Sequence, residues 1–501
     1  MRRPPNSMEG TAHVGVDTAE RGTIDQLRVL IGGSWREGNG EPLSVISPST
    51  GQTIASGRAS SPDQVNEAVS AASNAFPALA NLSAHERAGF CHGVAAALRQ
   101  RIESMARDLA LEQGKPLAEA RIEISVAAEM FEAAAEDGKR LNGEILPSAD
   151  TTRRIFVTRV PLGVVAVITP WNFPVTIPSE YLSACLAVGN TVVWKPASLT
   201  PISALHLAEC FQEAGVPAGA LNIVLGAGST IGPLLASHPS VTGIGLTGSS
   251  KSGEAVARVA GTRRLLLELG GNGPAILAKD ADLAKAIPRL AVGCFANAGQ
   301  ICDSTERIIV HRSLVSAVID GLRDEVSRIS LGRSLDDGVT MGPLNNERTA
   351  SKVDRHLRDA VAGGARVIAG GGRDSGWATD LYYQPTIVTD VKLEMPLNRE
   401  ETFGPVAAVL SFEEDEEAIA IANGTDLGLV AGVFTRDISR ANHYARELHA
   451  GIVNINETPT YWQPHTPFGG FAGTRSGVGR LGGTYTLMEL TQTKAVVVDI
   501  S

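Results

Sequence analysis

Apolar side chains recur at helical spacing along the first third of the chain. The segment Ser61-Pro62-Asp63-Gln64 has a serine, then a proline at the first helical position, then a glutamine three residues after the serine, which is the pattern of a capped helix start. Apolar residues follow at the spacing of one helix face: Val65, Ala68, Val69, Ala72 and Phe76. Ser83 and Glu86 repeat the capping pattern. The pattern therefore predicts helices from residue 62 to about residue 142.

The hydrophobic pattern then changes to short, continuous, β-branched runs. Val164–Ile168 and Thr191–Trp194 are typical of parallel strands that are buried on both faces. Helices are expected near Ser179–Ala187 and Ala204–Glu213, and a further strand over Leu221–Leu225. Alternating strands and helices of this length predict a doubly wound α/β sheet.

A second α/β stretch runs from Asn272 to about Asn456. It contains three strand candidates, at residues 308–310, 366–368 and 430–434. The acidic run Glu413–Glu417 is interpreted as a solvated helix start, where carboxylates meet the positive end of the helix dipole. The final run, Lys494–Asp499, is expected to be an exposed strand that forms an arm with Arg153–Arg159 and pairs across subunits.

Composition excludes several classes of protein. The net charge of −10 argues against binding to a nucleic-acid backbone, and no apolar run approaches the roughly 20 residues that span a bilayer. The five cysteines are odd in number and scattered, without a CxxC pair or a His/Cys cluster, so neither disulfides nor a metal site is expected. No nucleic acid, metal or membrane partner is therefore predicted, and a reducing, cytoplasmic location is expected.

Cys302 is the first candidate for chemistry. It follows Asn297-Ala298-Gly299-Gln300-Ile301, where a glycine and polar residues indicate a turn. One interpretation is a small, buried core residue, and the other is a nucleophile whose thiolate attacks a carbonyl carbon, provided that its surroundings lower the thiol pKa. Cys294 lies in a more apolar stretch and is the better candidate for a structural cysteine.

Two further residues lie in settings that suit catalysis. Glu268 stands in an apolar run just before a glycine pair, where it is either a capping or ion-paired carboxylate or a general base with a raised pKa. Asn172 follows a predicted strand, between aromatic residues. Its amide either makes a local turn or donates a hydrogen bond to a developing oxyanion.

The combination of motifs is more specific than any one of them. PWNFP, KPA, LTGSxxxG, LELGG, GQxC, EETFGPV and PFGG occur in this order along about 300 residues. The sequence closely resembles the aldehyde dehydrogenase superfamily over nearly the whole chain after about Leu30. The resemblance implies a Rossmann-like cofactor domain at 26–145 and 164–270, and an α/β catalytic domain at 271–480. It also implies a small β oligomerisation arm at 146–163 and 484–501, while residues 1–25 are expected to be a mobile tail.

The resemblance also implies roles for the catalytic candidates. Cys302 is expected to form a thiohemiacetal with the aldehyde, and Asn172, together with the backbone N–H of Cys302, to form the oxyanion hole. Hydride transfer to the nicotinamide would leave a thioester on Cys302. Glu268 would activate water for hydrolysis to the free acid.

The cofactor implied by the resemblance is NAD or NADP. Lys195 is expected to hold the adenosine ribose, and Glu401 the nicotinamide ribose, with Phe403 nearby. The turn and helix start that include Thr247, Gly248, Ser249 and Gly253 would lie beside the pyrophosphate. The other expected cofactor contacts are Trp171, Ser198, Gly228 and Leu269.

Two departures from the family pattern bear on specificity. Ser198 stands where NAD-preferring members often carry a glutamate. Its hydroxyl removes a charge that would repel a 2′-phosphate and offers a donor, so NADP is expected to be accepted. The helix after PWNFP carries Glu180 and Tyr181 and lacks an arginine for a distal carboxylate, which weakens the case for succinate semialdehyde.

The sequence leaves the substrate class open among aromatic, amino- and short polar aldehydes. Glu180, Asp303 and Glu457 are either acidic groups near the substrate entrance, suited to a cationic or hydroxylated aldehyde, or solvent-facing acids on its rim. Tyr461 and Trp462 are candidates for an aromatic pocket.

Other functions remain as alternatives on the same fold. One is an enzyme that passes the acyl group to coenzyme A, or an esterase that uses the same cysteine; Glu268 argues against acyl transfer to coenzyme A. The other is a non-catalytic, structural member of the family. A homodimer or homotetramer is expected from the resemblance.

Overall fold

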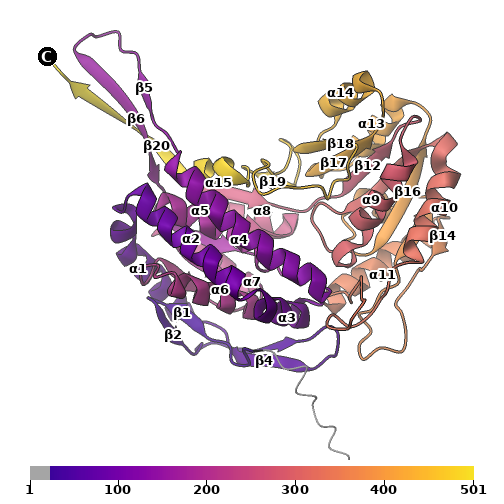
Figure 1. Cartoon of the computed structure of the whole chain (residues 1–501), viewed down its shortest axis with the longest axis horizontal. Helices are drawn as coiled ribbons and strands as arrows, with labels where there is room; N and C mark the ends of the chain where they lie inside the picture. Colours follow the sequence, from indigo (N-terminus) through magenta and orange to yellow (C-terminus); the bar gives the residue numbers. More distant parts are fainter. Residues whose placement is uncertain (1–22) are drawn as a thin grey trace, which may run out of the picture.

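The computed structural model describes residues 23–501 of the chain. It contains an eight-stranded sheet, a seven-stranded sheet and a three-stranded sheet that projects as an arm from the first of them (Figure 1). A two-stranded hairpin, β3 (Pro42–Ile46) and β4 (Thr53–Arg58), completes the strands. Most of the expected mobile tail, residues 1–22, lies outside the described part. Thr23 is held in place, because its backbone N–H donates to Asp108 at 3.0 Å.

The first sheet is doubly wound. Its order is β19 (Gly477–Val478), β11 (Arg264–Glu268), β10 (Val241–Thr247), β7 (Val164–Ile168), β8 (Thr191–Lys195), β9 (Leu221–Ile223), β1 (Val29–Ile31) and β2 (Ser34–Arg36). The five central strands are parallel, and the strand order reverses between β7 and β10. β7 and β8 are buried along their whole length, as their continuous apolar runs predict.

Helices cover both faces of this sheet. One layer contains α2 (Ala84–Gln100), α3 (Ile102–Gln113), α4 (Leu117–Lys139), α5 (Thr176–Val188) and α6 (Pro201–Glu213). The other contains α1 (Pro62–Ala80), α7 (Gly228–Ser237) and α8 (Ser250–Ala260). Both predicted capping boxes are present, at Ser61 and Ser83. The helices α5 and α6 each begin three residues earlier than the expected Ser179 and Ala204, and β9 ends at Ile223 rather than Leu225.

The second sheet has its own apolar core. Its order is β14 (Arg366–Ala369), β15 (Thr386–Thr389), β16 (Val406–Phe412), β13 (Thr305–His311), β12 (Gly273–Leu277), β17 (Val430–Phe434) and β18 (Ile452–Ile455). The helices of this half are α9 (Leu283–Phe295), α10 (Val315–Val326), α11 (Glu347–Ala362), α12 (Pro396–Arg399), α13 (Asp415–Asn423) and α14 (Ile438–Glu447). The acidic run lies in the first turn of α13, as predicted.

The arm joins distant parts of the chain. β20 (Thr491–Asp499) pairs antiparallel with β6 (Arg153–Pro161), and β6 pairs with β5 (Glu144–Leu146). Before the arm, β19 adds to the edge of the first sheet, and α15 (Gly483–Glu489) packs against α4 and α5. Residues 477–489 therefore lie with the first sheet, which differs from the boundaries at 480 and 484 that the sequence suggested.

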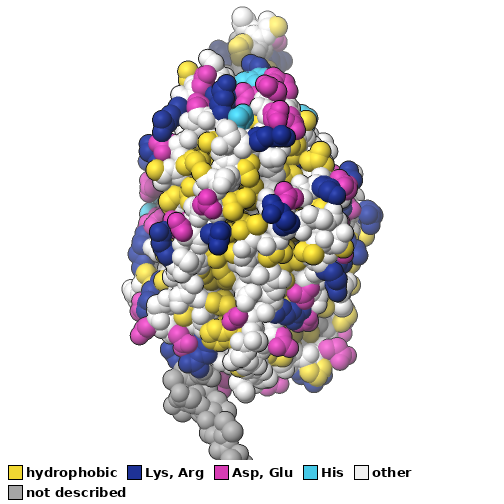
Figure 2. All heavy atoms as spheres, turned by 90° about the vertical axis from the view of Figure 1, so that its right-hand side faces the viewer, with side chains coloured by type: hydrophobic (Ala, Val, Ile, Leu, Met, Phe, Trp, Pro, Cys, Tyr) yellow, Lys and Arg dark blue, Asp and Glu magenta, His cyan; other side chains and the backbone are white. Residues whose placement is uncertain are grey.

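Surface charge and helix composition relate to the expectation that neither nucleic acid nor a membrane is a partner. Figure 2 shows basic and acidic side chains interspersed, rather than separated by sign, on the face that it presents. Within residues 23–501, no helix combines the length and apolar character needed to cross a bilayer.

Candidate active site

The first sheet gathers several candidate residues at one edge. Ligands of doubly wound sheets bind at the carboxyl ends of the strands where the strand order reverses, which here is between β7 and β10. The turn with Trp171 and Asn172 follows β7, and Thr247 ends β10. Lys195 and Glu268 are the last residues of β8 and β11. Parallel pairing therefore brings these separate motifs together.

The second sheet contributes through the loops that precede its strands. Cys302 lies in a turn between the 3-10 helix η2 (Ala296–Gly299) and β13. Asn297 and Ala298 within η2 have left-handed backbone angles, with φ of 48° and 54°. Gly271 must be a glycine, because a Cβ atom at this position would collide with the carbonyl oxygen of Cys302. The segment that connects β11 of the first sheet to β12 of the second sheet therefore passes directly beside Cys302.

These loops line a single large cleft, with a volume of about 860 Å³. It is lined by the following candidates: Trp171, Asn172, Lys195, Ser198, Gly228, Thr247, Gly248, Ser249, Glu268, Leu269, Cys302, Glu401 and Phe403. Gly253 does not line the cleft. It packs under Leu269 instead, whose side chain fills the space that a Cβ atom at Gly253 would need.

Cys302 differs from the other cysteines by its access to the cleft. It is partly exposed, whereas the other four cysteines are buried. The Cys294 thiol donates to the backbone oxygen of Thr305, which agrees with its structural assignment. Burial and the charges of Glu268 and Asp303 raise the pKa of Cys302, so these neighbours do not supply the lowered thiol pKa that the nucleophile interpretation requires. Activation of the sulfur therefore requires a positive charge or a base at the site.

Glu268 is the candidate for such a base. Its carboxylate interacts with the Cys302 thiol and the Thr247 hydroxyl, and its Oε1 atom has no hydrogen-bond partner among the described residues. It is neither a helix cap nor part of an ion pair with a residue in that part of the chain. Burial, reinforced by the charge of Glu180, raises the pKa of Glu268 well above its usual value. A raised pKa makes the carboxylate a better proton acceptor than an exposed glutamate.

Asn172 is fixed by a buried polar network that the sequence did not indicate. Its Nδ2 atom donates to the carbonyl oxygen of Gln300 at 3.1 Å, which leaves a second amide hydrogen available. The backbone carbonyl oxygen of Asn172 accepts from Lys115 Nζ at 2.9 Å, and Lys115 is paired with buried Glu123. The backbone N–H of Cys302 donates to no other residue within 23–501. One amide hydrogen of Asn172 and the backbone N–H of Cys302 are therefore free to donate, as the expected oxyanion hole would require.

The adenosine side of the cleft contains a cation without a partner. Lys195 forms no hydrogen bond or ion pair with the described residues, and burial lowers its pKa to about 8. Ser198 donates its hydroxyl hydrogen to the carbonyl oxygen of Gly226 at 2.7 Å. The Ser198 hydroxyl is therefore not free to donate to a 2′-phosphate, as the sequence suggested. Position 198 nevertheless carries no carboxylate that would repel that phosphate. Together with the Ser249-capped start of α8, an unpaired lysine suits an anionic dinucleotide.

The opposite end of the cleft is organised around Glu401 and Phe403. Glu401 accepts from the backbone N–H of Gly271 at 3.2 Å and lies 3.9 Å from Lys352. Phe403 has a left-handed φ of 62° and meets Trp171 edge-to-face, with ring centroids 5.6 Å apart. Glu306 holds this loop by accepting from the N–H groups of Thr402 and Phe403. Lys352 and Glu306 were missed, because neither stands in a conspicuous motif.

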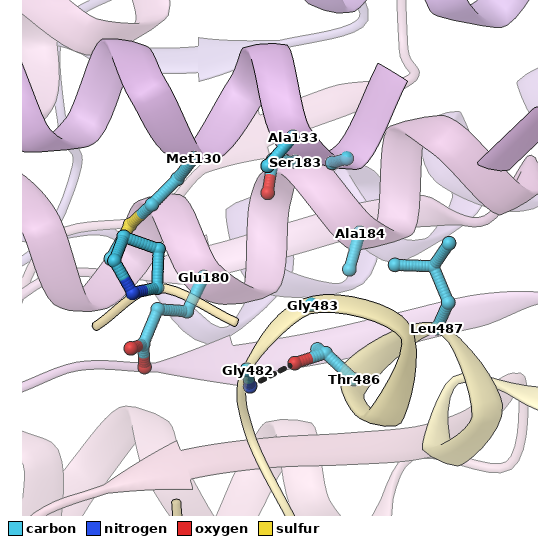
Figure 3. Close-up of a pocket in the computed structure, with 11 residues that line it drawn as sticks. Met130, Ala133, Glu180, Ser183, Ala184, Gly482, Gly483, Thr486 and Leu487 are labelled. Carbon is cyan, nitrogen blue, oxygen red and sulfur yellow. Dashed lines mark hydrogen bonds between the residues drawn. The ribbon is translucent and has the colours of Figure 1, made fainter. Parts of the chain in front are cut away.

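The three acids expected near the substrate entrance differ in their surroundings. Glu457 forms an ion pair with Arg289 at 2.6 Å, so it is not a free charge at the entrance. Asp303 is buried, and Glu180 lines a smaller cavity between α4, α5 and the start of α15 (Figure 3). Trp462 packs with Cys302 against a small apolar cluster of Leu429, Val430 and Phe468, whereas Tyr461 is exposed.

Comparison with known proteins gives concordant results. Residues 35–496 match the aldehyde dehydrogenase family. The chain is 39% identical to the NADP(+) succinate-semialdehyde dehydrogenase of Escherichia coli, over 94% of this chain and 98% of that protein. It is 37% identical to a 3-sulfolactaldehyde dehydrogenase of Priestia aryabhattai, over 95% and 99%. A crystal structure of an E. coli NADP-dependent enzyme superposes with a TM-score of 0.92 at 39% identity, covering 95% of this chain and 98% of that one.

Proposed function

The chain belongs to the aldehyde dehydrogenase family, and on this basis we propose that it oxidises an aldehyde to the carboxylic acid through a thioester on Cys302, with NAD or NADP as the oxidant. The observation that supports this most is the presence of a cleft-facing thiol and an unpaired, buried carboxylate in one large cleft.

The first half of the reaction uses Cys302 and Asn172. The sulfur attacks the aldehyde carbon, and the carbonyl oxygen takes up negative charge as the thiohemiacetal forms. The free amide hydrogen of Asn172 and the backbone N–H of Cys302 stabilise that charge. Lys195 and Glu401 would hold the dinucleotide, which when bound would supply the hydride acceptor.

The second half of the reaction uses Glu268. Loss of hydride leaves an acyl group on the sulfur, and this thioester must be hydrolysed before another turnover. Glu268 is the carboxylate that interacts with the thiol and has a free oxygen, so we assign it the proton of the attacking water. The carboxylic acid then leaves and the thiol is regenerated.

This function is tested by incubating the purified protein with an aldehyde panel and either cofactor, with and without coenzyme A. We expect reduced cofactor and the free acid without coenzyme A. An absolute requirement for coenzyme A would support the acylating alternative. A complete absence of reduced cofactor would support a structural member of the family.

The substrate class follows in part from the relatives. Succinate semialdehyde and 3-sulfolactaldehyde, for which two relatives are named, both carry a charged group at the end remote from the aldehyde. We therefore propose an aldehyde with a charged remote group for this chain as well. The helix after PWNFP carries no arginine to pair a distal carboxylate, which weakens the case for succinate semialdehyde in particular.

The cofactor site predicts that NADP is used. The cleft around Lys195 and Ser198 presents no carboxylate to repel a 2′-phosphate. Ser198→Glu should lower kcat/KM for NADP by about tenfold or more, because a like charge would be placed against the phosphate. Steady-state rates with NAD and NADP measure the effect.

The matched control for this prediction is Ser198→Gln, which adds similar volume without charge. The glutamine variant should retain more NADP activity than the glutamate variant. Strict use of NAD by the unaltered protein would contradict the proposed cofactor specificity.

The arm is proposed to join copies of the chain. β20 is the free edge of its sheet, and the arm exposes a set of large apolar side chains: Ile145, Leu146, Phe156, Val496, Val497, Val498 and Ile500. An exposed apolar edge strand is suited to pairing with another subunit. We expect a dimer or tetramer by light scattering, and Val497→Asp should shift it towards smaller species.

Val292→Asp on α9 is the control, because Val292 is as exposed (62%) as Val497 (61%) but lies away from the arm. It should leave the oligomer intact. A monomeric unaltered protein would contradict the proposed role of the arm.

A further inference from the structure

Glu306 is a buried carboxylate that the proposed chemistry does not use. It is the second residue of β13, close to Cys302 in the sequence, and only 4% of its surface is exposed. It forms no ion pair with the described residues, and the neighbouring Arg307 donates to three backbone carbonyl oxygens instead. A buried carboxylate without a cation destabilises a fold unless hydrogen bonds replace its lost hydration. Its hydrogen-bond partners therefore indicate what it does.

Both hydrogen bonds that the Glu306 carboxylate makes among residues 23–501 go to one loop. One oxygen accepts from the backbone N–H of Thr402 at 2.6 Å, and the other accepts from that of Phe403 at 2.7 Å. The strands β13 and β16 are parallel neighbours, so the start of β13 lies beside the loop that precedes β16. Glu306 therefore ties the segment that carries Cys302 to residues 401–404.

The loop 401–404 has a backbone that needs such support. Phe403 has a φ of 62°, a left-handed conformation that a bulky residue rarely adopts. The loop is also pressed against the turn before Cys302, because a Cβ atom at Gly299 would collide with the carbonyl oxygen of Gly404. A strained loop in close contact keeps its shape only where the surrounding structure holds it.

The loop directs two side chains into the cleft that Cys302 also lines, Glu401 and Phe403. Glu401 accepts from the backbone N–H of Gly271 at 3.2 Å, and the Phe403 ring meets Trp171 with centroids 5.6 Å apart. Both side chains are candidates for the nicotinamide end of the cofactor. The distance from a bound nicotinamide to the sulfur would therefore depend on where the loop is held.

We propose that Glu306 is a positioning residue, which fixes Glu401 and Phe403 relative to Cys302 and so places the nicotinamide end of the cofactor at the nucleophile. Glu306 does not itself line the cleft. The inference rests on the proposed function and adds a residue that acts through the loop. Two consecutive N–H groups require two acceptor oxygens, and a glutamine would set its NH₂ donor against one of them.

The test measures the binding of NADPH by fluorescence titration, without substrate, in Glu306→Gln, Glu401→Gln and the double variant; NADH replaces NADPH if the unaltered protein binds only NADH. Glu306→Gln should weaken binding by about tenfold, as is usual when a charge-assisted hydrogen bond is lost. In the Glu401→Gln background the same change should have a much smaller effect, because Glu306 acts through the position of Glu401. An equal loss in both backgrounds would overturn the inference.

Asp280→Asn is the matched control for a general loss of stability. Asp280 also accepts a backbone N–H, from Arg436, but it follows β12 at the carboxyl edge of the same sheet and does not line the cleft. This variant should melt at a lower temperature and bind the reduced cofactor with unchanged affinity. A loss of affinity equal to that of Glu306→Gln would mean that the effect is not specific to the loop, and would overturn the inference.

Glu306→Asp decides the question if the glutamine variant does not fold. Aspartate keeps the charge but is one methylene shorter, so it should bind the reduced cofactor several-fold more weakly than the unaltered protein. Unchanged affinity in a folded Glu306→Gln or Glu306→Asp protein would overturn the inference and leave the proposed function standing. Failure of the unaltered protein to bind either reduced cofactor would overturn both.

Discussion

Replacing Cys302 with alanine should lower the rate of aldehyde oxidation by at least about a thousandfold, the order of loss seen when a covalent nucleophile is removed. Cys302 is the one cysteine of residues 23–501 that lines the cleft, so no neighbouring sulfur can substitute for it. Cofactor binding should persist, because Lys195 and Glu401 are unaffected. Steady-state assays and a fluorescence titration with reduced cofactor measure the two properties separately.

Cys294→Ala is the matched control. Cys294 is buried and donates to the backbone of Thr305, so its loss should affect stability rather than chemistry. A Cys302→Ala protein that still oxidised aldehydes at a comparable rate would rule out the thioester mechanism.

Glu268→Gln should uncouple the two halves of the reaction. Glutamine keeps the shape of the side chain but cannot accept the proton of the attacking water, so the thioester should form and persist. Rapid mixing should show a burst of reduced cofactor no larger than one equivalent per active site. Slow turnover should follow, about a hundredfold below the unaltered protein or less.

Thr402→Ser tests whether a burst is specific to the loss of the base. Thr402 is buried and does not line the cleft; its backbone N–H donates to Glu306, and its hydroxyl contacts His356, which a serine hydroxyl can also do. This variant should turn over without a burst. A near-normal steady-state rate in Glu268→Gln would mean that another group activates the water.

The sequence predicted the strands and helix starts that depend on local patterns. The continuous apolar runs at Val164–Ile168 and Thr191–Trp194 became buried parallel strands, and Ser61 and Ser83 cap helices with the residues three positions later. The starts of α5 and α6 depend instead on distant residues. Glu123 accepts the N–H groups of Val175 and Thr176, and Glu112 accepts those of Ile202 and Ser203. A buried carboxylate from another helix leaves no local sign at the helix that it caps.

Interactions with residues that are distant along the chain could not be predicted for the site either. Motifs identified the residues that line the cleft, but hydrogen-bond partners depend on the folded chain. Ser198 uses its donor on Gly226, and Glu457 is neutralised by Arg289, 168 residues away along the chain. Lys115 and Glu123 fix Asn172 from a helical region where charged residues are ordinarily exposed. The direction of the Cys302 pKa shift also follows from three-dimensional crowding of acids, which spacing along the chain does not show.

The central claim is that the acyl group is carried on the sulfur of Cys302. Glu268→Gln protein, mixed with the oxidised cofactor and an aldehyde that the unaltered protein uses, can be quenched in acid, digested and analysed by mass spectrometry. The account predicts that the peptide containing Cys302 gains the mass of the aldehyde less one hydride and one proton, and only when cofactor is present. An unmodified Cys302 after a burst of reduced cofactor, or an acyl group on another cysteine, would contradict it.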